Sequence, residues 1–201
     1  MIGSMVILPA IASLRFNSPK MPLPSPDSHQ QKSQEKSTIG LLGENLVALW
    51  LQDHGWEIIA RRWRCRWGEI DIIAGEIPGE QLPEHPYQRI AFVEVKTRKH
   101  RSLDAGGLLS IPPQKQAKLL QTAEIFLGDR PELSNCPCQF DVALVSYQKY
   151  QRRSSAPQTT FTTEFSSPII LGQPVSIENS LGEYQLTLYQ YIAGAFDAEI
   201  S

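Results

Sequence analysis

Apolar residues recur at helical spacing over residues 39–54, which predicts a helix there. Thr38 can cap its start, and Gly55, which favours a left-handed backbone, marks its end. One face carries the apolar stripe Ile39, Leu42, Leu46, Leu49 and Trp50. The opposite face carries Val47, Ala48 and Leu51 and, at the same spacing, Glu44. Because an unpaired charge on a buried face is costly, Glu44 needs a partner.

Short runs rich in Ile, Val and aromatic residues follow this helix and predict strands. Residues 56–62, 69–74 and 89–98 suggest a meander, with prolines in the connection 75–88 preventing ladder pairing there. Pro112 and Pro113 open a second helix that ends near residue 127, and strands are predicted over 140–145 and 184–191. The order α, β, β, β, α, β predicts an α/β fold, a mixed central sheet flanked by helices.

Two segments outside these elements contain stretches that are poor in apolar residues. Residues 1–36 end in a stretch dominated by Pro, Ser, Gln and Lys, which predicts a disordered N-terminal tail. Residues 37–201 are predicted to form one domain, with a long loop insertion at about 149–182. No run of about 18 apolar residues occurs, so we expect no membrane-spanning helix and no membrane partner.

Charge is distributed unevenly along the chain. The net charge of the 201 residues is −2, but residues 61–101 contain nine basic and six acidic residues. A basic segment inside an acidic chain favours a local nucleic-acid contact over a global one. The three cysteines, an odd number, do not suggest a disulfide framework, which fits a cytoplasmic location.

Acidic and basic residues converge on the strand predicted over residues 89–98. Side chains alternate along a strand, so Glu94, Lys96 and Arg98 share one face. For a lone acid and base at this spacing, a solvated polar face is the simpler interpretation. Here, however, a hairpin can bring Asp71 of the preceding strand beside Glu94, and the first helix can add Glu44.

Such a cluster of carboxylates suggests a particular chemistry. Carboxylates packed together repel one another unless a cation neutralises them or one takes up a proton, and oxygen ligands favour Mg²⁺ or Mn²⁺. A metal ion there can polarise a phosphoryl oxygen, while Lys96 orients the attacking water or stabilises the transition state. The pattern therefore predicts phosphodiester hydrolysis.

Basic residues on either side of this cluster favour a nucleic acid as the substrate. Arg62, Arg64 and Arg66 alternate with Trp63 and Trp67 in one short segment. We expect the arginines to contact phosphates and the tryptophans to cover the core. Further basic residues predicted to join this surface are Arg98, Arg101 and, near the start of the second helix, Lys115, for which a solvated position is equally compatible.

The motifs also resemble a known family. They are Gly40-x-x-Gly43-Glu44, Gly68-Glu69-Ile70-Asp71, the run Phe92 to Arg98 (FVEVKTR), Lys115 and Phe140-Asp141. Together they resemble the YraN family of bacterial proteins over about residues 39–145. That family is similar to Holliday junction resolvases and to the restriction-endonuclease-like superfamily, with its D-(E)xK active site on a mixed sheet.

This resemblance implies roles for individual residues. Asp71 and Glu94 would be metal ligands, Lys96 the catalytic lysine, and Glu44 an additional catalytic acid and metal ligand. We therefore expect a Mg²⁺-dependent or Mn²⁺-dependent endonuclease acting on DNA, with branched DNA as the substrate that the resemblance implies. A homodimer fits an enzyme that cuts two strands symmetrically.

Two other functions compete with this hypothesis. A nucleic-acid-binding module would keep the fold and the basic surface without hydrolysing anything. Metal-assisted chemistry on a small phosphorylated molecule is the third, but the glycines Gly106 and Gly107 match no phosphate-loop spacing.

Overall fold

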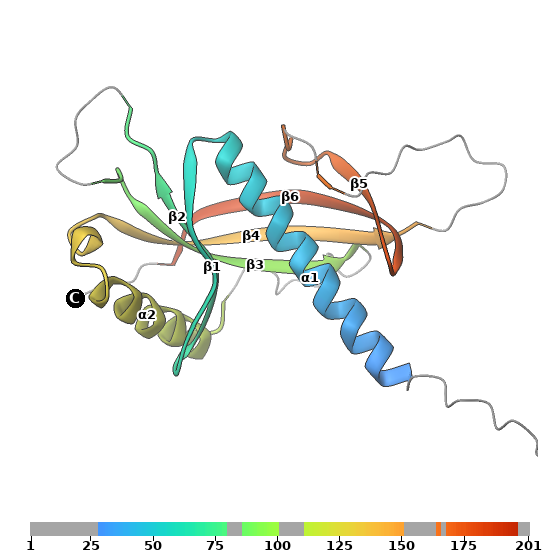
Figure 1. The fold of residues 1–201 in the computed structure, drawn as a ribbon, viewed down its shortest axis with the longest axis horizontal. Coiled ribbons are helices and arrows are strands. Elements are labelled where there is room, and N and C mark those ends of the chain that lie inside the picture. Colours follow the sequence, from blue (N-terminus) through green and yellow to red (C-terminus); the bar gives the residue numbers. More distant parts are fainter. Residues whose placement is uncertain (1–27, 80–85, 101–110, 151–163, 166–167, 197–201) are drawn as a thin grey trace, which may run out of the picture.

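The computed structural model describes residues 28–79, 86–100, 111–150, 164–165 and 168–196 (Figure 1). Its elements in chain order are α1 (Ser28–Asp53), β1 (Trp56–Cys65), β2 (Gly68–Glu76), β3 (Ile90–Lys99), α2 (Pro113–Gly128), the 3₁₀ helix η2 (Pro131–Leu133), β4 (Cys138–Lys149), β5 (Pro174–Asn179) and β6 (Gly182–Phe196). None of the helices in these described segments is long and apolar enough to cross a membrane.

One mixed sheet organises the molecule. Its strand order is β1-β2-β3-β4-β6-β5. Strands β3 and β4 are parallel, and every other neighbouring pair is antiparallel. A parallel pair needs a crossover connection, and α2 lies in it. The predicted α/β class, with a meander of three strands at the start, is confirmed and is consistent with the nuclease-like core that the resemblance implies.

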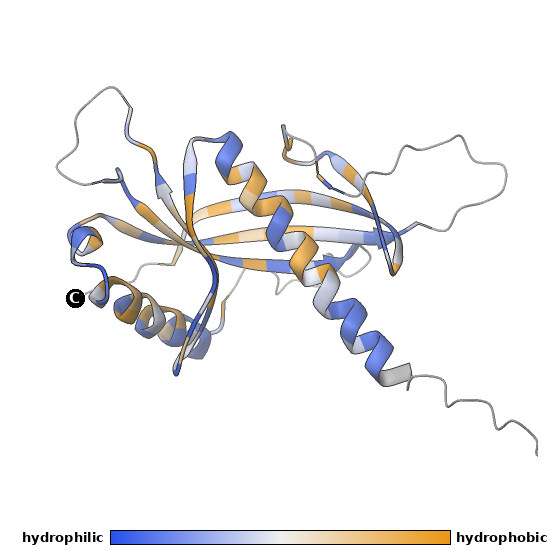
Figure 2. Ribbon diagram, viewed as in Figure 1, coloured by the Kyte–Doolittle hydropathy of each residue, from blue (hydrophilic) through white to orange (hydrophobic). Residues whose placement is uncertain are grey.

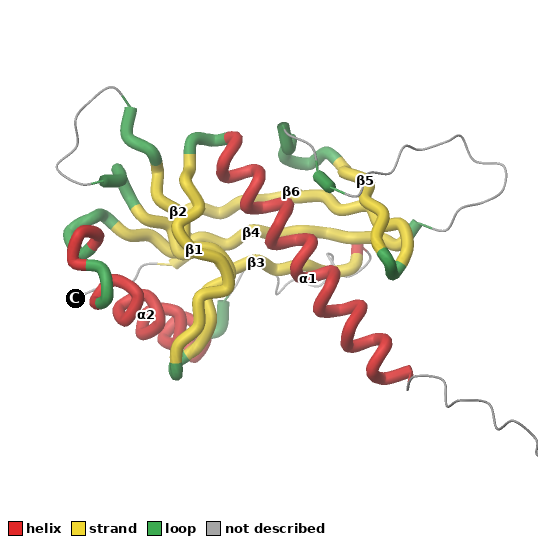
Figure 3. Tube along the Cα trace, in the orientation of Figure 1, coloured by secondary structure: helices red, strands yellow, loops and turns green. Residues whose placement is uncertain are grey.

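The two helices cover opposite faces of the sheet (Figure 3). Leu46, Val47 and Leu51 of α1 pack in one apolar cluster with residues such as Ile72 and Val93. Leu119, Ala123 and Phe126 of α2 pack in the other, with Phe92 and Phe140. Alternation along the strands supplies both clusters, because each strand that is buried on two faces contributes residues to each of them.

Helix α1 begins earlier than the sequence predicts. It starts at Ser28, whereas the pattern predicted a helix from residue 39 and a disordered tail up to residue 36. Figure 2 shows that its first turns are hydrophilic, which explains why no apolar stripe marks them. Glu35 anchors this part to the sheet by accepting hydrogen bonds from Tyr184 (2.6 Å) and Lys149 (2.9 Å). Residues 1–27 lie outside the described residues, so disorder there stays a prediction.

Strand β5 lies within the segment for which a loop was predicted. It begins at Pro174 and pairs only with β6, at the edge of the sheet. A proline is tolerated at the first position of an edge strand, so it does not prevent a strand here. Ile177 is buried and fixes this edge onto the α1 side of the core. The prediction of a loop was therefore wrong for residues 174–179, whereas residues 151–163 lie outside the described part.

Candidate functional site

The candidate site lies where strands β2 and β3 diverge. Their pairing runs from Gly75 opposite Ile90 to Ile72 opposite Val93. Beyond this point β2 continues along β1, whereas β3 continues along β4 as far as Lys99. Figure 3 shows the β1–β2 hairpin curving away from the sheet toward α2. The divergence leaves a fork into which side chains from both strands can extend.

Asp71 lies at this fork. It is the first residue of β2 beyond the last β2–β3 pair, and its Oδ2 accepts a hydrogen bond from the backbone N–H of Val95 at 2.8 Å. Burial, and next the charge of Glu94, raise the pKa of Asp71 to about 7, and the charge of Glu44 adds to this effect. The fork therefore holds a carboxyl group that titrates near neutral pH.

Glu94 and Glu44 approach Asp71 from different elements. Glu94 is on β3, and its Oε2 lies 3.1 Å from Nζ of Lys115 on α2. Glu44 is on α1, and its Oε2 lies 3.8 Å from Nε of Arg62. The two glutamate side chains are 15% and 12% exposed, and each of these Oε2 atoms is buried yet accepts no hydrogen bond within the described residues. Burial also raises the pKa of Glu44, against the opposing charges of Arg62 and Arg61.

A close helix–strand contact sets the position of Glu44. A Cβ atom on Gly43 would overlap Oγ1 of Thr97 on β3, so only glycine fits at this position without a shift. The Thr97 hydroxyl is itself buried and has no hydrogen-bond partner among the described residues. The glycine next to Glu44 thus allows α1 to approach the strand that carries Glu94.

Lys96 follows Glu94 on the same strand. It is partly buried, and burial lowers the pKa of its ammonium group. The charge of Glu94 opposes this shift, whereas those of Arg98 and Lys115 reinforce it. A lysine in such surroundings is easier to deprotonate than one in water, which suits a group that handles a proton or a water molecule.

A cavity of about 480 Å³ opens beside the fork on the α1 side. Glu44 and Asp71 line it together with three cationic residues, Lys36, Arg98 and Lys99. Carboxylates and cations in one cavity can hold a metal ion and an anion side by side.

The predicted phosphate-binding arginines have partners within the protein. Arg62 donates to Glu69 at 3.1 Å, and Arg64 lies 2.9 Å from the other oxygen of the same carboxylate. Arg62 also has a positive φ of 49°, which is uncommon outside glycine. Arg66 lies over the ring of Trp67, 5.2 Å from its centroid. All three arginines are exposed and form a basic surface, in which Glu69 holds Arg62 and Arg64 in place.

The other predicted contacts differ in their positions. Arg98 donates to the backbone carbonyl of Thr97 at the rim of the cavity, and Arg101 lies outside the described residues. Trp63 packs edge-on against Phe126, 5.3 Å between ring centroids, which confirms its predicted place in the core. Trp67 instead is 43% exposed at the turn between β1 and β2, so the same prediction was wrong for that residue.

Two residues of the site were missed in the sequence. Lys36 was assigned to the tail, and Thr97 was placed on the face of β3 away from the acids. A signal for Lys36 exists, because Lys36, Gly40 and Glu44 are four residues apart and share one helix face. For Thr97 no such signal exists, because its contact with Gly43 depends on how closely α1 approaches β3.

The carboxylates do not form a preassembled metal site. In the described segments no three His, Cys, Asp or Glu side chains are close enough together to hold an ion. The carboxylates of Asp71 and Glu94, whose charges interact across the fork, nevertheless fit a hard divalent cation. Asp71 has a raised pKa, and Oε2 of Glu94 is buried and accepts no hydrogen bond from the described residues.

Comparison with known proteins agrees with the resemblance found in the motifs. The family described as "Uncharacterised protein family UPF0102" matches residues 43–145, which include all the site residues on β1, β2 and β3 described above. A UPF0102 protein of Trichodesmium erythraeum is 45% identical over 164 residues, 81% of this chain and 90% of its own length. Another, from Acaryochloris marina, is 42% identical over 87% of this chain and 99% of its own. A third, from Synechocystis, is 38% identical over 79% and 97%.

Proposed function

The chain belongs to the UPF0102 family, which is the YraN family predicted from the motifs, and we propose that it is a metal-dependent nuclease that hydrolyses phosphodiester bonds in DNA. The observation that carries this proposal is the carboxylate cluster at the β2–β3 fork. Asp71 accepts one backbone N–H there, while Glu94 and Glu44 both raise its pKa. A cluster of like charges is costly for the fold, and such clusters are typical of sites that bind a cation.

We assign the metal ligands to Asp71 and Glu94. When bound, Mg²⁺ or Mn²⁺ would polarise the phosphoryl oxygen and make a bound water more acidic. Asp71 is held in position by the Val95 N–H, and Glu94 by its place on the central strand β3. Glu44 acts from the α1 side and increases the negative potential at Asp71.

Lys96 and the neighbouring cations act on the substrate. Lys96 has a pKa lowered by burial and follows the ligand Glu94 by two residues, so it is placed to orient the attacking water or to stabilise the charge on the phosphate. Lys36, Arg98 and Lys99 line the adjoining cavity and would hold a flanking phosphate. Arg62, Arg64 and Arg66 extend this basic surface along the β1–β2 hairpin.

A nucleic-acid-binding module is the second candidate function. It is favoured by the ion pair between Lys115 and Glu94, because a lysine that neutralises a carboxylate reduces the need for a metal ion. It is also favoured by the absence, among the described residues, of three ligands within reach of one ion. For both the nuclease and the binding module, we propose branched DNA as the ligand and a homodimer as the oligomeric state.

Cleavage of labelled duplex, single-stranded and four-way-junction DNA with Mg²⁺, Mn²⁺ or EDTA tests the proposal. We expect metal-dependent cleavage by the wild type and a loss of at least about 1,000-fold in Asp71→Asn, since the metal supplies several kcal/mol of transition-state stabilisation. Asp129→Asn, an exposed change just after α2, is the matched control. Binding without cleavage would favour the binding module, and equal cleavage by wild type and Asp71→Asn would refute this active site.

A further inference from the structure

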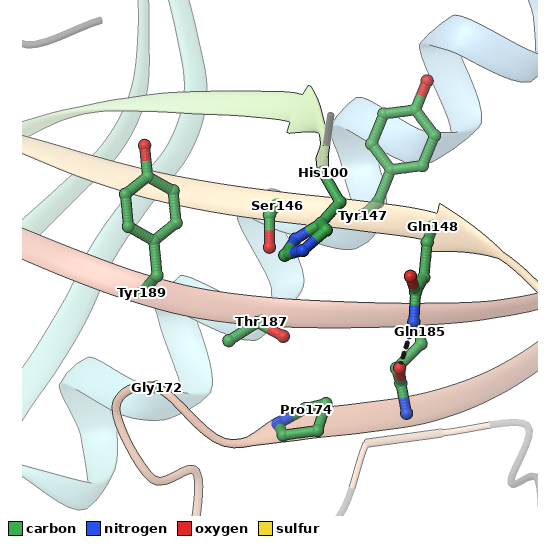
Figure 4. Close-up of a pocket in the computed structure, with 9 residues that line it drawn as sticks. All are labelled: His100, Ser146, Tyr147, Gln148, Gly172, Pro174, Gln185, Thr187 and Tyr189. Atoms are coloured by element: carbon green, nitrogen blue, oxygen red, sulfur yellow. Dashed lines mark hydrogen bonds between the residues drawn. The ribbon is translucent and has the colours of Figure 1, made fainter. Parts of the chain in front are cut away.

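A second cavity lies on the face of the sheet that α2 covers elsewhere (Figure 4). It has a volume of about 380 Å³ and lies over β4, β6 and the start of β5. Ser146 and Gln148 follow Leu144 at alternate positions of β4, and Leu144 belongs to the cluster beneath α2. Helix α2 packs on β1 and β2, so no described helix covers this end of the face.

One strand links this cavity to the candidate active site. Glu94 and Lys96 occupy alternate positions of β3 on this face, and His100 follows one residue after the strand. Beyond Val93, β3 pairs with no described strand on the side opposite β4, so Arg98 at this open edge lines the α1-side cavity as well. His100 lines the second cavity, and Arg98 is in register with Ser146 of β4. At about 3.3 Å per residue, His100 is about 20 Å from Glu94. A polymer that lies on Lys96 and Arg98 would reach the cavity a few units from the reacting phosphate.

The cavity has the chemistry of a site for a neutral, planar, hydrogen-bonding group. Its described lining contains hydroxyl groups, side-chain amides and two kinds of ring, but no carboxylate, lysine or arginine. Gln148 donates a hydrogen bond to the amide oxygen of Gln185 (Figure 4), and the pair still presents an acceptor oxygen and an NH₂ group. Paired amide donors and acceptors match the edge of a nucleobase, whereas a phosphate would need cations.

The aromatic residues of the cavity fit the same ligand. Tyr189 on β6 is partly buried, and burial raises the pKa of its phenol, so the ring stays neutral. The imidazole of His100 is exposed at the end of β3. Base–aromatic stacking tolerates every base, because each has a π-face. Ser146 and Thr187 lie between Tyr189 and the amide pair, with His100 nearer the amides (Figure 4).

We infer that this cavity is a subsite for an unpaired nucleobase of the DNA whose backbone runs along β3. The inference rests on the proposed function and deepens it, because a base inside a duplex cannot enter the cavity. The substrate would then carry at least one unpaired nucleotide near the cleaved bond, as single-stranded DNA does.

Binding of short single strands to Asp71→Asn in EDTA isolates the subsite from cleavage. A fluorescently labelled oligonucleotide is compared with one of equal length that lacks its bases, which keeps the phosphates. We expect the abasic strand to bind about tenfold more weakly, as stacking of one base accounts for at least this factor. Gln148→Ala combined with Gln185→Ala, or Tyr189→Leu alone, should reduce this ratio to about threefold or less.

Gln121→Ala, at an exposed position of α2, is the matched control and should leave the ratio unchanged. Gln148 and Gln185 are not buried, so we expect the double glutamine variant to fold even if Tyr189→Leu does not. Thermal unfolding of both variants checks this. Equal binding of the two oligonucleotides by Asp71→Asn would overturn the subsite. If the two oligonucleotides bind equally but the wild type still cleaves DNA, the subsite is refuted and the proposed nuclease activity is not. If binding depends on the bases but no DNA is cleaved, the subsite belongs to a binding module.

Discussion

Two aspartates on neighbouring parts of the central sheet have opposite surroundings. Asp141 on β4 is 1% exposed and accepts hydrogen bonds from Tyr191 (2.6 Å), Gln139 (2.9 Å) and the backbone N–H of Gly194 (2.9 Å). Asp71 on β2 accepts one, from Val95, and is close to two further carboxylates. The same side chain is therefore fully hydrogen-bonded in one place and electrostatically destabilised in the other.

This difference separates a structural acid from a candidate functional one. Asp141 joins β4 to the end of β6, and burial beside its carboxylate raises the pKa of Tyr191. Three donors satisfy its charge, as a buried ion requires. Among the described residues Asp71 has one such donor, the N–H of Val95, and the neighbouring carboxylates repel its charge. Such arrangements are typical of functional sites, where the chemistry offsets their cost in stability.

The largest effect on stability is expected at Asp141. In Asp141→Asn, an NH₂ group replaces one acceptor oxygen and faces donors, so buried hydrogen bonds are lost without replacement. We expect a loss of about 2–4 kcal/mol in the free energy of unfolding. Urea unfolding measures it, with Asp129→Asn as the exposed control. A loss below about 0.5 kcal/mol would mean that the two aspartates differ less than their hydrogen bonds imply.

Asp71→Asn should change stability in the opposite direction. The folded-state pKa of Asp71, about 7, lies above its unfolded value, so ionisation destabilises the native protein increasingly from about pH 4 to about pH 7 and constantly above that. The asparagine variant removes this penalty. We expect it to be more stable than the wild type by about 1–3 kcal/mol near pH 8, and by less near pH 5.

Adding Mg²⁺ should narrow this stability difference. A ligand that binds only the native state stabilises it by mass action, so the wild type should gain stability near pH 8 while Asp71→Asn gains little. Urea unfolding at both pH values, with and without Mg²⁺, provides the measurement. If the wild type were the more stable protein near pH 8 without metal, Asp71 would be a structural acid like Asp141.

The sequence predicted the elements of the site better than their contacts. Strand β3 was predicted within one residue at each end, because an apolar run with an alternating acid and base has one natural register. Glu44 was placed on a buried face of α1 from spacing alone. By contrast, the first turns of α1 and strand β5 depend on tertiary contacts, those of Glu35 with Tyr184 and of Ile177 with the core. Such contacts join residues far apart in the chain and leave no local pattern.

The charge partners were equally hidden from the sequence. The basic segment suggested free arginines, but Arg62 and Arg64 both pair with Glu69. Lys115, given a supporting role from its position, instead lies against Glu94. The first outcome depends on the register of the β1–β2 hairpin, in which Arg64 is opposite Glu69. The second depends on where α2 lies beside β3. Sequence spacing fixes which residues share a face of one element, whereas ion pairs require the relative positions of two.

The smallest effect, on metal affinity, is expected from changing Lys115. This lysine forms an ion pair with Glu94, one of the two carboxylates at the fork. Its ammonium group is 3.1 Å from Glu94, and its side chain is 42% exposed. The lysine therefore neutralises Glu94 where a metal ion would bind, but only weakly because water screens the charge. Lys115→Gln should therefore strengthen Mn²⁺ binding to the free protein by about two- to fivefold, as measured by calorimetric titration. Lys118→Gln, at an exposed position of the same helix, should leave the affinity unchanged. Weaker Mn²⁺ binding by Lys115→Gln would show that the lysine helps to hold the carboxylates in place for the ion. Glu94 would then depend on a donor from the protein, as Asp141 does.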